Sequence, residues 1–227
     1  TMHTLPAQEI PFLWGIGWET GTRPAAMGGA YTGVAEGYGA FAYNPAGLGL
    51  TKSTQVYGSF SRVSLDNSTN YLGEIHTEST VSTGLHNIGV ALPLPTSRGS
   101  LVLGIGYHSI RNFDRSLFGD VFISTPGDSV TWSYTEMESG RLGNTTFAGA
   151  IEIAPGTFVG AAVNFWTGKD DYTSQFTEKD EPFNLWTFSE YYQTLNIITK
   201  FTGVNFVFSG LADVNRNVRL GASIQSP

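Results

Sequence analysis

Charged residues are scarce in this chain, and cysteine is missing. Only 14% of its 227 residues are Asp, Glu, Lys or Arg, well below the share of about 25% in ordinary soluble domains. Lys and Arg number 12 against 19 Asp and Glu, so the net charge is −7. This balance excludes the dense basic face that a nucleic-acid binder needs. Because the chain has no Cys, disulfide frameworks, iron–sulfur sites and thiolate zinc sites are excluded as well.

Long apolar runs are also missing. No stretch approaches the ~18 consecutive apolar residues that indicate a membrane-spanning helix. The chain opens without the basic and apolar regions of a secretory signal peptide. Since its first residue is Thr1, we expect that such a peptide has already been removed. Glycine (28 residues) and aromatic side chains (13%) are abundant instead. Both a secreted β-sandwich and an outer-membrane β-barrel fit this composition.

From residue 54 onward the sequence alternates with the period of a β-strand. Leu103 and Ile105, for example, fall on one face of their strand, and Gly104, Gly106 and His108 on the other. The faces opposite the large apolar side chains are small or polar and carry very few charges. Most of the predicted strands run about 9–12 residues, the length that a tilted strand needs to cross a bilayer, whereas globular strands average about 5–6 residues. The seven predicted strands are 54–65, 86–94, 100–110, 144–153, 157–167, 196–209 and 217–225.

The connections between these strands alternate in length. Short connections at 94–99, 155–156 and 212–216 alternate with long polar stretches at roughly 65–85, 111–141 and 168–195. Short turns at one end and long loops at the other are typical of outer-membrane barrels. The alternation therefore favours a barrel over a sandwich. We expect the long loops to contain strand extensions, for instance over Val130–Glu136 and Trp186–Tyr192.

Two strings near the N-terminus carry a family resemblance. Residues 22–31 read TRPAAMGGAY and residues 43–48 read YNPAGL. Together they resemble the N-terminal region of the FadL/OmpP1/TodX family of outer-membrane transporters. Residues 217–227 are similar to a mid-barrel strand of that family, and Leu92-Pro93-Leu94-Pro95 is a less specific match.

The resemblance implies an all-β fold. Family members are transmembrane antiparallel β-barrels of about 14 strands whose lumen is plugged by an N-terminal hatch of short helices and turns. We therefore expect a hatch over residues 1–52 and the first seven or so strands of a barrel over 53–227. This is about half of a barrel, and its open edges would cost several kcal/mol per unpaired backbone group in lipid. We expect the remaining strands to come from residues outside this chain.

The resemblance also implies a function. Family members carry long-chain fatty acids or hydrocarbons inward across the bacterial outer membrane, so we expect an uptake channel for hydrophobic small molecules. Asn44 is expected to hydrogen-bond its own backbone two residues on and so fix the turn before Pro45. Glycine permits close approach or positive φ. The predicted hatch or gating residues are Asn44, Pro45, Ala46, Gly47, Gly28 and Gly29. A static turn that joins the hatch to the first strand is the alternative.

Aromatic and polar side chains supply candidates for substrate binding, because such sites are mostly apolar with a few orienting polar groups. His108 and Arg219 are candidates to orient a carboxylate head group, and Arg219 alternatively pairs with Glu152. Packing of the hatch is the alternative role of the N-terminal aromatic residues. The candidates are Phe12, Trp14, Trp18, His108, Phe118, Trp186 and Arg219.

The sequence also bears on two other function classes. A related branch of barrels, resembling the PorV-type components of the type IX secretion system, carries the same strings and binds partner proteins instead of importing solutes. Enzyme motifs are missing: the histidines show no metal-ligand spacing and no Gly-x-Ser-x-Gly elbow occurs. We therefore expect no catalysis, metal or cofactor. The expected partners are outer-membrane lipid and a hydrophobic ligand, with a protein partner only in the PorV-like case.

Overall fold

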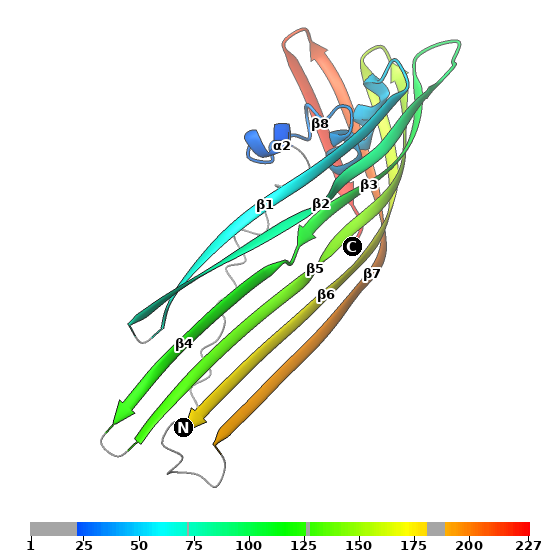
Figure 1. Ribbon diagram of the computed structural model, residues 1–227. Helices are drawn as coiled ribbons and strands as arrows, with labels where there is room; N and C mark the ends of the chain where they lie inside the picture. Colours follow the sequence, from blue (N-terminus) through cyan, green and yellow to red (C-terminus); the bar gives the residue numbers. More distant parts are fainter. Residues whose placement is uncertain (1–21, 72, 126–127, 181–188) are drawn as a thin grey trace.

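The computed structural model describes residues 22–71, 73–125, 128–180 and 189–227, and most of them are in β-strands (Figure 1). Short helical segments come first: α2 (Thr22–Ala26), α3 (Gly39–Tyr43) and the 3-10 helix η2 (Pro45–Leu50). The strands that follow are β1 (Gln55–Tyr71), β2 (Glu74–Leu94), β3 (Leu101–Asn112), β4 (Arg115–Thr125), β5 (Asp128–Ala154), β6 (Thr157–Asp180), β7 (Glu190–Asn215) and β8 (Val218–Gln225). In this described part of the chain, no helix is long and apolar enough to cross a membrane.

All eight strands belong to one antiparallel sheet, in the order β1-β2-β3-β5-β6-β7-β8, with β4 pairing with β5 as well. Asn112 at the end of β3 lies opposite Arg141 of β5, and Arg115 at the start of β4 lies opposite Glu138. β4 therefore continues the line of β3 after a break at residues 113–114. The sheet curls strongly into a half-barrel (Figure 1).

The sandwich alternative is wrong for the described residues, because one sheet takes the place of two stacked layers. A sandwich would bury its large apolar side chains in a shared centre. Here Leu103 is 48% exposed and Leu220 is 62% exposed, both on the face away from the helical segments. We call this the outer face, and the face that the helical segments cover the inner face.

The inner face carries small or polar side chains, as the alternation predicts. On β5 the outer residues Phe147 and Ile151 are about half exposed, whereas the inner residues Ala148 and Ala150 are buried. The buried core lies between the inner face and the helical segments, where Phe41 and Leu48 pack on Val102 and the inner alanines. Burial of apolar side chains against the helical segments therefore occurs on the inner face of the sheet and not on the outer face.

The seven predicted strands are all present, but most are longer than predicted. The stretches predicted as long loops are largely strand: β1 and β2 run on to Tyr71 and from Glu74, and β5 begins at Asp128. The extension predicted over Val130–Glu136 is confirmed, and Tyr191 and Tyr192 lie in β7 while Trp186 lies outside the described residues. The Pro155-Gly156 turn is confirmed, but the β7–β8 turn falls at Arg216-Asn217 because β7 continues to Asn215.

Candidate functional site

Asn44 fastens the helical segments to the wall of the half-barrel. It caps η2, and its Oδ1 accepts a hydrogen bond from the Ala46 amide at 3.1 Å, which is the bond that the turn chemistry predicts. Its Nδ2 donates to the Thr32 carbonyl at 2.9 Å and to the Gly210 carbonyl of β7 at 3.1 Å. The side chain is fully buried. We call residues 22–52 the hatch segment, after the predicted hatch. One amide thus joins two parts of the hatch segment and a distant strand.

Further hydrogen bonds join the hatch segment, residues 22–52, to other strands. The Ser209 hydroxyl of β7 lies 2.9 Å from the Ala46 amide, and the Ser100 hydroxyl donates to the Gly49 carbonyl at 2.8 Å. On the opposite side, the Tyr38 hydroxyl donates to the Tyr107 carbonyl of β3 at 2.9 Å. The hatch segment is therefore bonded to β7, to β3 and to the turn that precedes β3.

Close packing completes these contacts. A Cβ atom at Gly160 of β6 would overlap the backbone of Pro45 and Ala46, and one at Gly47 would overlap the Ala35 carbonyl. Only glycine allows such approaches between backbones. Gly28 and Gly29 differ, since both have open space around them and adopt positive φ angles of 62° and 82°.

A row of polar side chains crosses the inner face next to the hatch segment. Asn87, His108 and Asn144 lie directly opposite one another on β2, β3 and β5. The row continues from β5 to β6 and β7. The Thr146 hydroxyl of β5 donates to Asn164 Oδ1 of β6 at 2.7 Å, and Asn164 Nδ2 donates to Asn205 Oδ1 of β7 at 2.9 Å. The polar row consists of Asn87, His108, Asn144, Thr146, Asn164 and Asn205. All six are buried, and the row offers amide, hydroxyl and imidazole groups without a fixed charge.

His108 is the most distinctive member of the row. Its side chain is 2% exposed, and its ring meets the Tyr38 ring edge-on at 6.1 Å. Its Nδ1 has no hydrogen-bond partner among the described residues. A buried polar atom without a partner costs free energy, so this nitrogen is available to a ligand or water that reaches the row.

An aromatic pair lies on the other side of the row from the hatch segment. Gly160 lies four residues from Asn164 in one direction along the sheet, and Phe201 lies four residues from Asn205 in the other. The Phe201 ring stacks on the Phe113 ring at 5.8 Å. Because residues four apart on a strand share a face, the inner face presents the hatch segment, the polar row and the aromatic pair in succession.

The remaining predicted residues do not gather with His108. Arg219 lies near the short-turn end, and its Nε pairs with Asp213 Oδ1 at 2.5 Å. The predicted alternative of a pair with Glu152 is wrong, since Glu152 accepts from the Gly156 amide instead. Phe118 lies on β4, where its ring meets the His76 ring edge-on. Phe12, Trp14, Trp18 and Trp186 lie outside the described residues.

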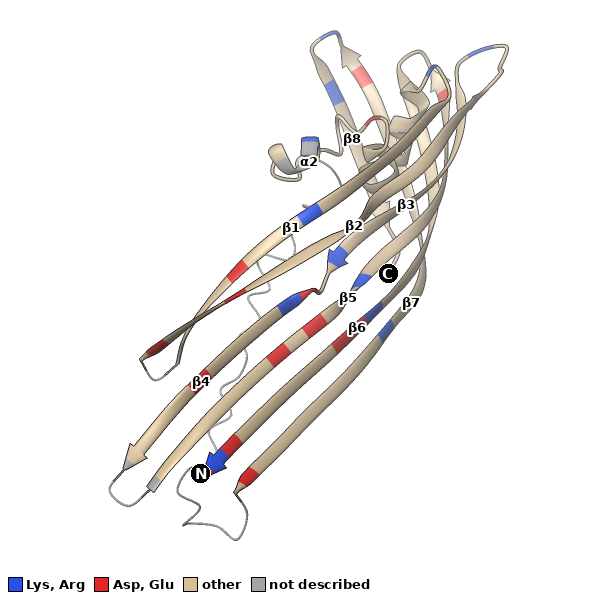
Figure 2. Cartoon of the chain, in the orientation of Figure 1, with Lys and Arg blue, Asp and Glu red and all other residues tan. Residues whose placement is uncertain are grey.

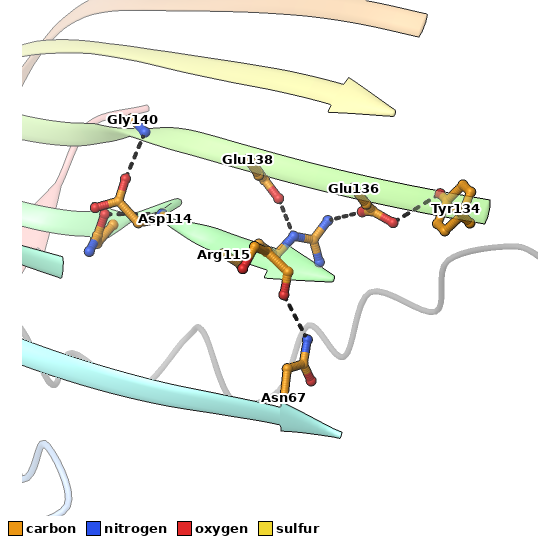
Figure 3. A network of polar contacts seen from close by, with 9 residues as sticks. Asn67, Asp114, Arg115, Tyr134, Glu136, Glu138 and Gly140 are labelled. Carbon is orange, nitrogen blue, oxygen red and sulfur yellow. Dashed lines mark hydrogen bonds and ion pairs between the residues drawn. The ribbon is translucent and has the colours of Figure 1, made fainter. Parts of the chain in front are cut away.

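A charged network that was not predicted from the sequence lies on the half of the sheet away from the short turns, which we call the far half (Figure 3). Arg115 of β4 bonds Glu136 Oε1 through Nη2 at 3.0 Å and Glu138 Oε2 through Nε. The Tyr134 hydroxyl donates to Glu136 Oε2 at 3.1 Å. The predicted extension over Val130–Glu136 covers Tyr134 and Glu136, but their partner Arg115 lies on β4, a strand that the sequence pattern did not predict.

Burial raises the pKa of the Glu138 carboxyl above its ordinary value. The nearby Asp170 carboxylate raises it further, and the Arg115 guanidinium opposes both effects. The network therefore concentrates carboxylates around a single guanidinium.

Side chains also join β2 to β4 where their backbones do not pair. His76 Nε2 lies 2.8 Å from the Asp120 carbonyl, and His76 Nδ1 lies 3.2 Å from Asp120 Oδ1. The Thr80 and Ser116 hydroxyls are 2.7 Å apart. These contacts hold the far half of the β1–β2 hairpin against β4.

Among the described residues, no group of three or more His, Asp or Glu side chains could hold a metal ion. Comparisons with protein-family models, curated proteins and solved structures found no match to this chain.

Proposed function

We propose that this chain forms part of an outer-membrane β-barrel that takes up hydrophobic small molecules, with the hatch segment occluding its lumen. The observation that carries the proposal is the sidedness of the sheet. Large apolar side chains such as Phe147, Phe206 and Leu220 are exposed on the outer face, and small or polar ones are buried on the inner face. A water-exposed sheet would be expected to reverse this pattern, whereas hydrocarbon around the outer face makes it favourable.

The distribution of charge supports the same placement. Acidic and basic residues gather near the short turns and on the far half of the sheet, and the strand segments between them carry almost none (Figure 2). Between Gly168 and Thr157, for example, β6 has no charged residue. A charge on the lipid face of a barrel costs about 2–4 kcal/mol at the midplane, so a charge-free band suits strands that cross a bilayer.

The open edges of the sheet support closure by additional strands. β1 pairs only with β2, and β8 pairs only with β7, among the described residues. Unpaired backbone groups at such edges each cost several kcal/mol in hydrocarbon. We therefore propose that further strands complete the barrel between β8 and β1.

The side chains of the inner face suit the binding of a hydrophobic solute that carries a polar group. The Phe113–Phe201 pair offers an apolar surface, and the polar row beside it offers hydrogen bonds without charge. Small-molecule sites commonly combine these two elements. The hatch segment lies beyond the polar row and would block passage until it shifts.

Uptake of labelled solutes by bacterial cells tests the function. Cells that lack their own fatty-acid transporter would express the full-length protein, and entry of a long-chain fatty acid and of an aromatic hydrocarbon would be measured. We expect uptake above the empty-vector rate. The Phe201→Ala variant, on the inner face of β7, should lower uptake, whereas Phe206→Ala, on the outer face, should not. No uptake by a correctly inserted protein, together with retention of a large protein partner, would contradict the proposal and favour the PorV-like alternative.

A further inference from the structure

Cations mark one border of the charge-free band. On five strands the first charged residue met on leaving the band toward the far half of the sheet is basic (Figure 2). These residues are Arg62 on β1, Arg111 on β3, Arg141 on β5, Lys169 on β6 and Lys200 on β7. They are five of the 12 Lys and Arg in a chain with net charge −7. β2 is the exception, since its first charged residue is Glu78.

The register brings three of these cations to one level. Arg141 lies directly opposite Lys169, and Lys169 lies directly opposite Lys200. Like charges that face each other on adjacent strands destabilise a sheet. Lys169 also forms an ion pair with Asp171 on its own strand. The row therefore places more positive than negative charge at one border of the band.

Lys169 and Lys200 point outward. Each lies four residues from an exposed apolar side chain of the outer face, Phe165 on β6 and Val204 on β7, and residues four apart on a strand share a face. Thr167 and Thr202 lie between them and the apolar residues, directly opposite each other and also exposed. We call Lys169, Lys200, Thr167 and Thr202 the cationic patch. Arg141 is less accessible, because its Nη1 donates to the Leu85 carbonyl of β2 at 3.3 Å.

We propose that the cationic patch binds the phosphate groups of the phosphorylated glycolipid in the outer leaflet of the membrane. This inference rests on the membrane placement in the proposed function, with the short turns on the periplasmic side as in bacterial outer-membrane barrels. Lysine ammonium groups bind phosphate as point charges, and threonine hydroxyls add hydrogen-bond donors. The aliphatic stem of a lysine can lie along apolar surface while its charged end reaches the head groups. At the border of the apolar band, the patch lies at the depth of lipid phosphates, and a bound phosphate relieves the repulsion between the two lysines.

Binding of lipid A to the full-length protein tests the proposal. The protein in uncharged maltoside micelles would be titrated with lipid A and, separately, with lipid A from which the phosphates have been removed, and bound lipid would be counted by native mass spectrometry. The test variant is Lys169→Gln/Lys200→Gln. The control is Lys52→Gln/Arg98→Gln, which removes two exposed cations near the short-turn end. A basic residue near an anionic membrane surface contributes about 1 kcal/mol, so the test variant should bind about 10- to 30-fold more weakly.

Thermal unfolding gives a second readout. Without lipid A, the test variant should unfold near the wild-type temperature, because the relieved repulsion between Lys169 and Lys200 offsets the loss of the exposed Lys169–Asp171 ion pair. With lipid A, it should gain less thermal stability than the wild type and the control. Equal affinity of wild type and test variant, equal binding of dephosphorylated lipid A, or binding of an acidic protein in place of lipid A would each overturn the proposal.

Insertion of wild type and test variant into liposomes is measured in parallel. Failure there contradicts the membrane placement, whereas normal insertion with unchanged lipid A binding contradicts only the patch.

Discussion

The two halves of this sheet are stabilised by different interactions. Near the short turns, the inner face packs against the hatch segment through Phe41, Leu48 and the bonds of Asn44, while the outer face is apolar. On the far half, the strands β4 and β5 are joined across the inner face by Arg115 and its carboxylate partners. A single sheet thus passes from a half organised by apolar packing to a half organised by charge. The border between them is the row of cations.

The largest effect is expected where the wall touches the hatch backbone. In Gly160→Ala the new Cβ would overlap Pro45 and Ala46, so the hatch segment must move away from β6. Overpacking of this kind costs about 1–3 kcal/mol, and more where backbone is the obstacle. Unfolding of the protein in detergent should show this loss. The same exchange at Gly58 of β1 meets nothing within 4 Å and should leave stability nearly unchanged.

Removal of the Asn44 amide should come next. Asn44→Ala leaves the carbonyls of Thr32 and Gly210 and the amide of Ala46 with fewer partners, and each unsatisfied buried group costs about 1–3 kcal/mol. Because other partners remain, such as Ser209 for Ala46, we expect a total of about 2–4 kcal/mol. Faster protease cleavage within the hatch segment would accompany it. Asn70→Ala removes an exposed turn bond instead, and an equal loss there would contradict this assignment.

Arg115→Gln should weaken the far half alone. The substitution leaves Glu136 and Glu138 without their guanidinium partner, and the cost for partly buried charges is about 1–3 kcal/mol. Since the pKa of Glu138 is already raised, loss of the opposing cation raises it more. A carboxyl whose pKa is raised in the folded state destabilises the fold as pH rises through that pKa.

Hydrogen exchange of β4 and β5 measures this effect. In the Arg115→Gln variant, protection of the far half should fall with rising pH more steeply than in the wild type, while protection near the hatch segment stays constant. Arg62→Gln, at the border of the band, is the control and should show no such pH dependence. An equal slope in both variants would show that Arg115 does not control the network.

The smallest change is expected in the polar row. Thr146→Val removes the hydroxyl that donates to Asn164 but keeps the shape, so the expected loss is about 1 kcal/mol. Thr145→Val, one residue along and on the other face, should cost less. Chemical denaturation of both variants in the same detergent checks the difference, and equal losses would indicate that the row is not held by this bond.

The near half of the sheet, next to the hatch segment, was predictable, whereas in the far half only strand extensions such as Val130–Glu136 were predicted. Residues 101–108 alternate large apolar with small or polar side chains, so strand and face follow from the sequence alone. The far half of β1 reads largely as Ser, Asn and Thr, and it becomes strand because β2 supplies a matching ladder. Polar alternation without an apolar face does not separate a paired strand from a loop.

The candidate site was predictable only in its local parts. The bond from Asn44 to Ala46 depends on neighbours in the chain, whereas its bond to Gly210 joins residues 166 positions apart. Likewise, the partner of Arg219 is Asp213 and not Glu152 because the register of β7 and β8 sets those two residues opposite each other. Register over such separations depends on the whole sheet.

Contact of the outer face with hydrocarbon can be measured by spin labelling. Because the chain has no Cys, single cysteines can be placed at each residue from 147 to 153 of the full-length protein in liposomes. Labels at Phe147, Gly149, Ile151 and Ile153 should be accessible to oxygen dissolved in lipid and shielded from a water-soluble nickel reagent. Labels at Ala148 and Ala150 should be shielded from oxygen. A pattern without this alternation, or nickel access on the outer face, would contradict a membrane around the sheet.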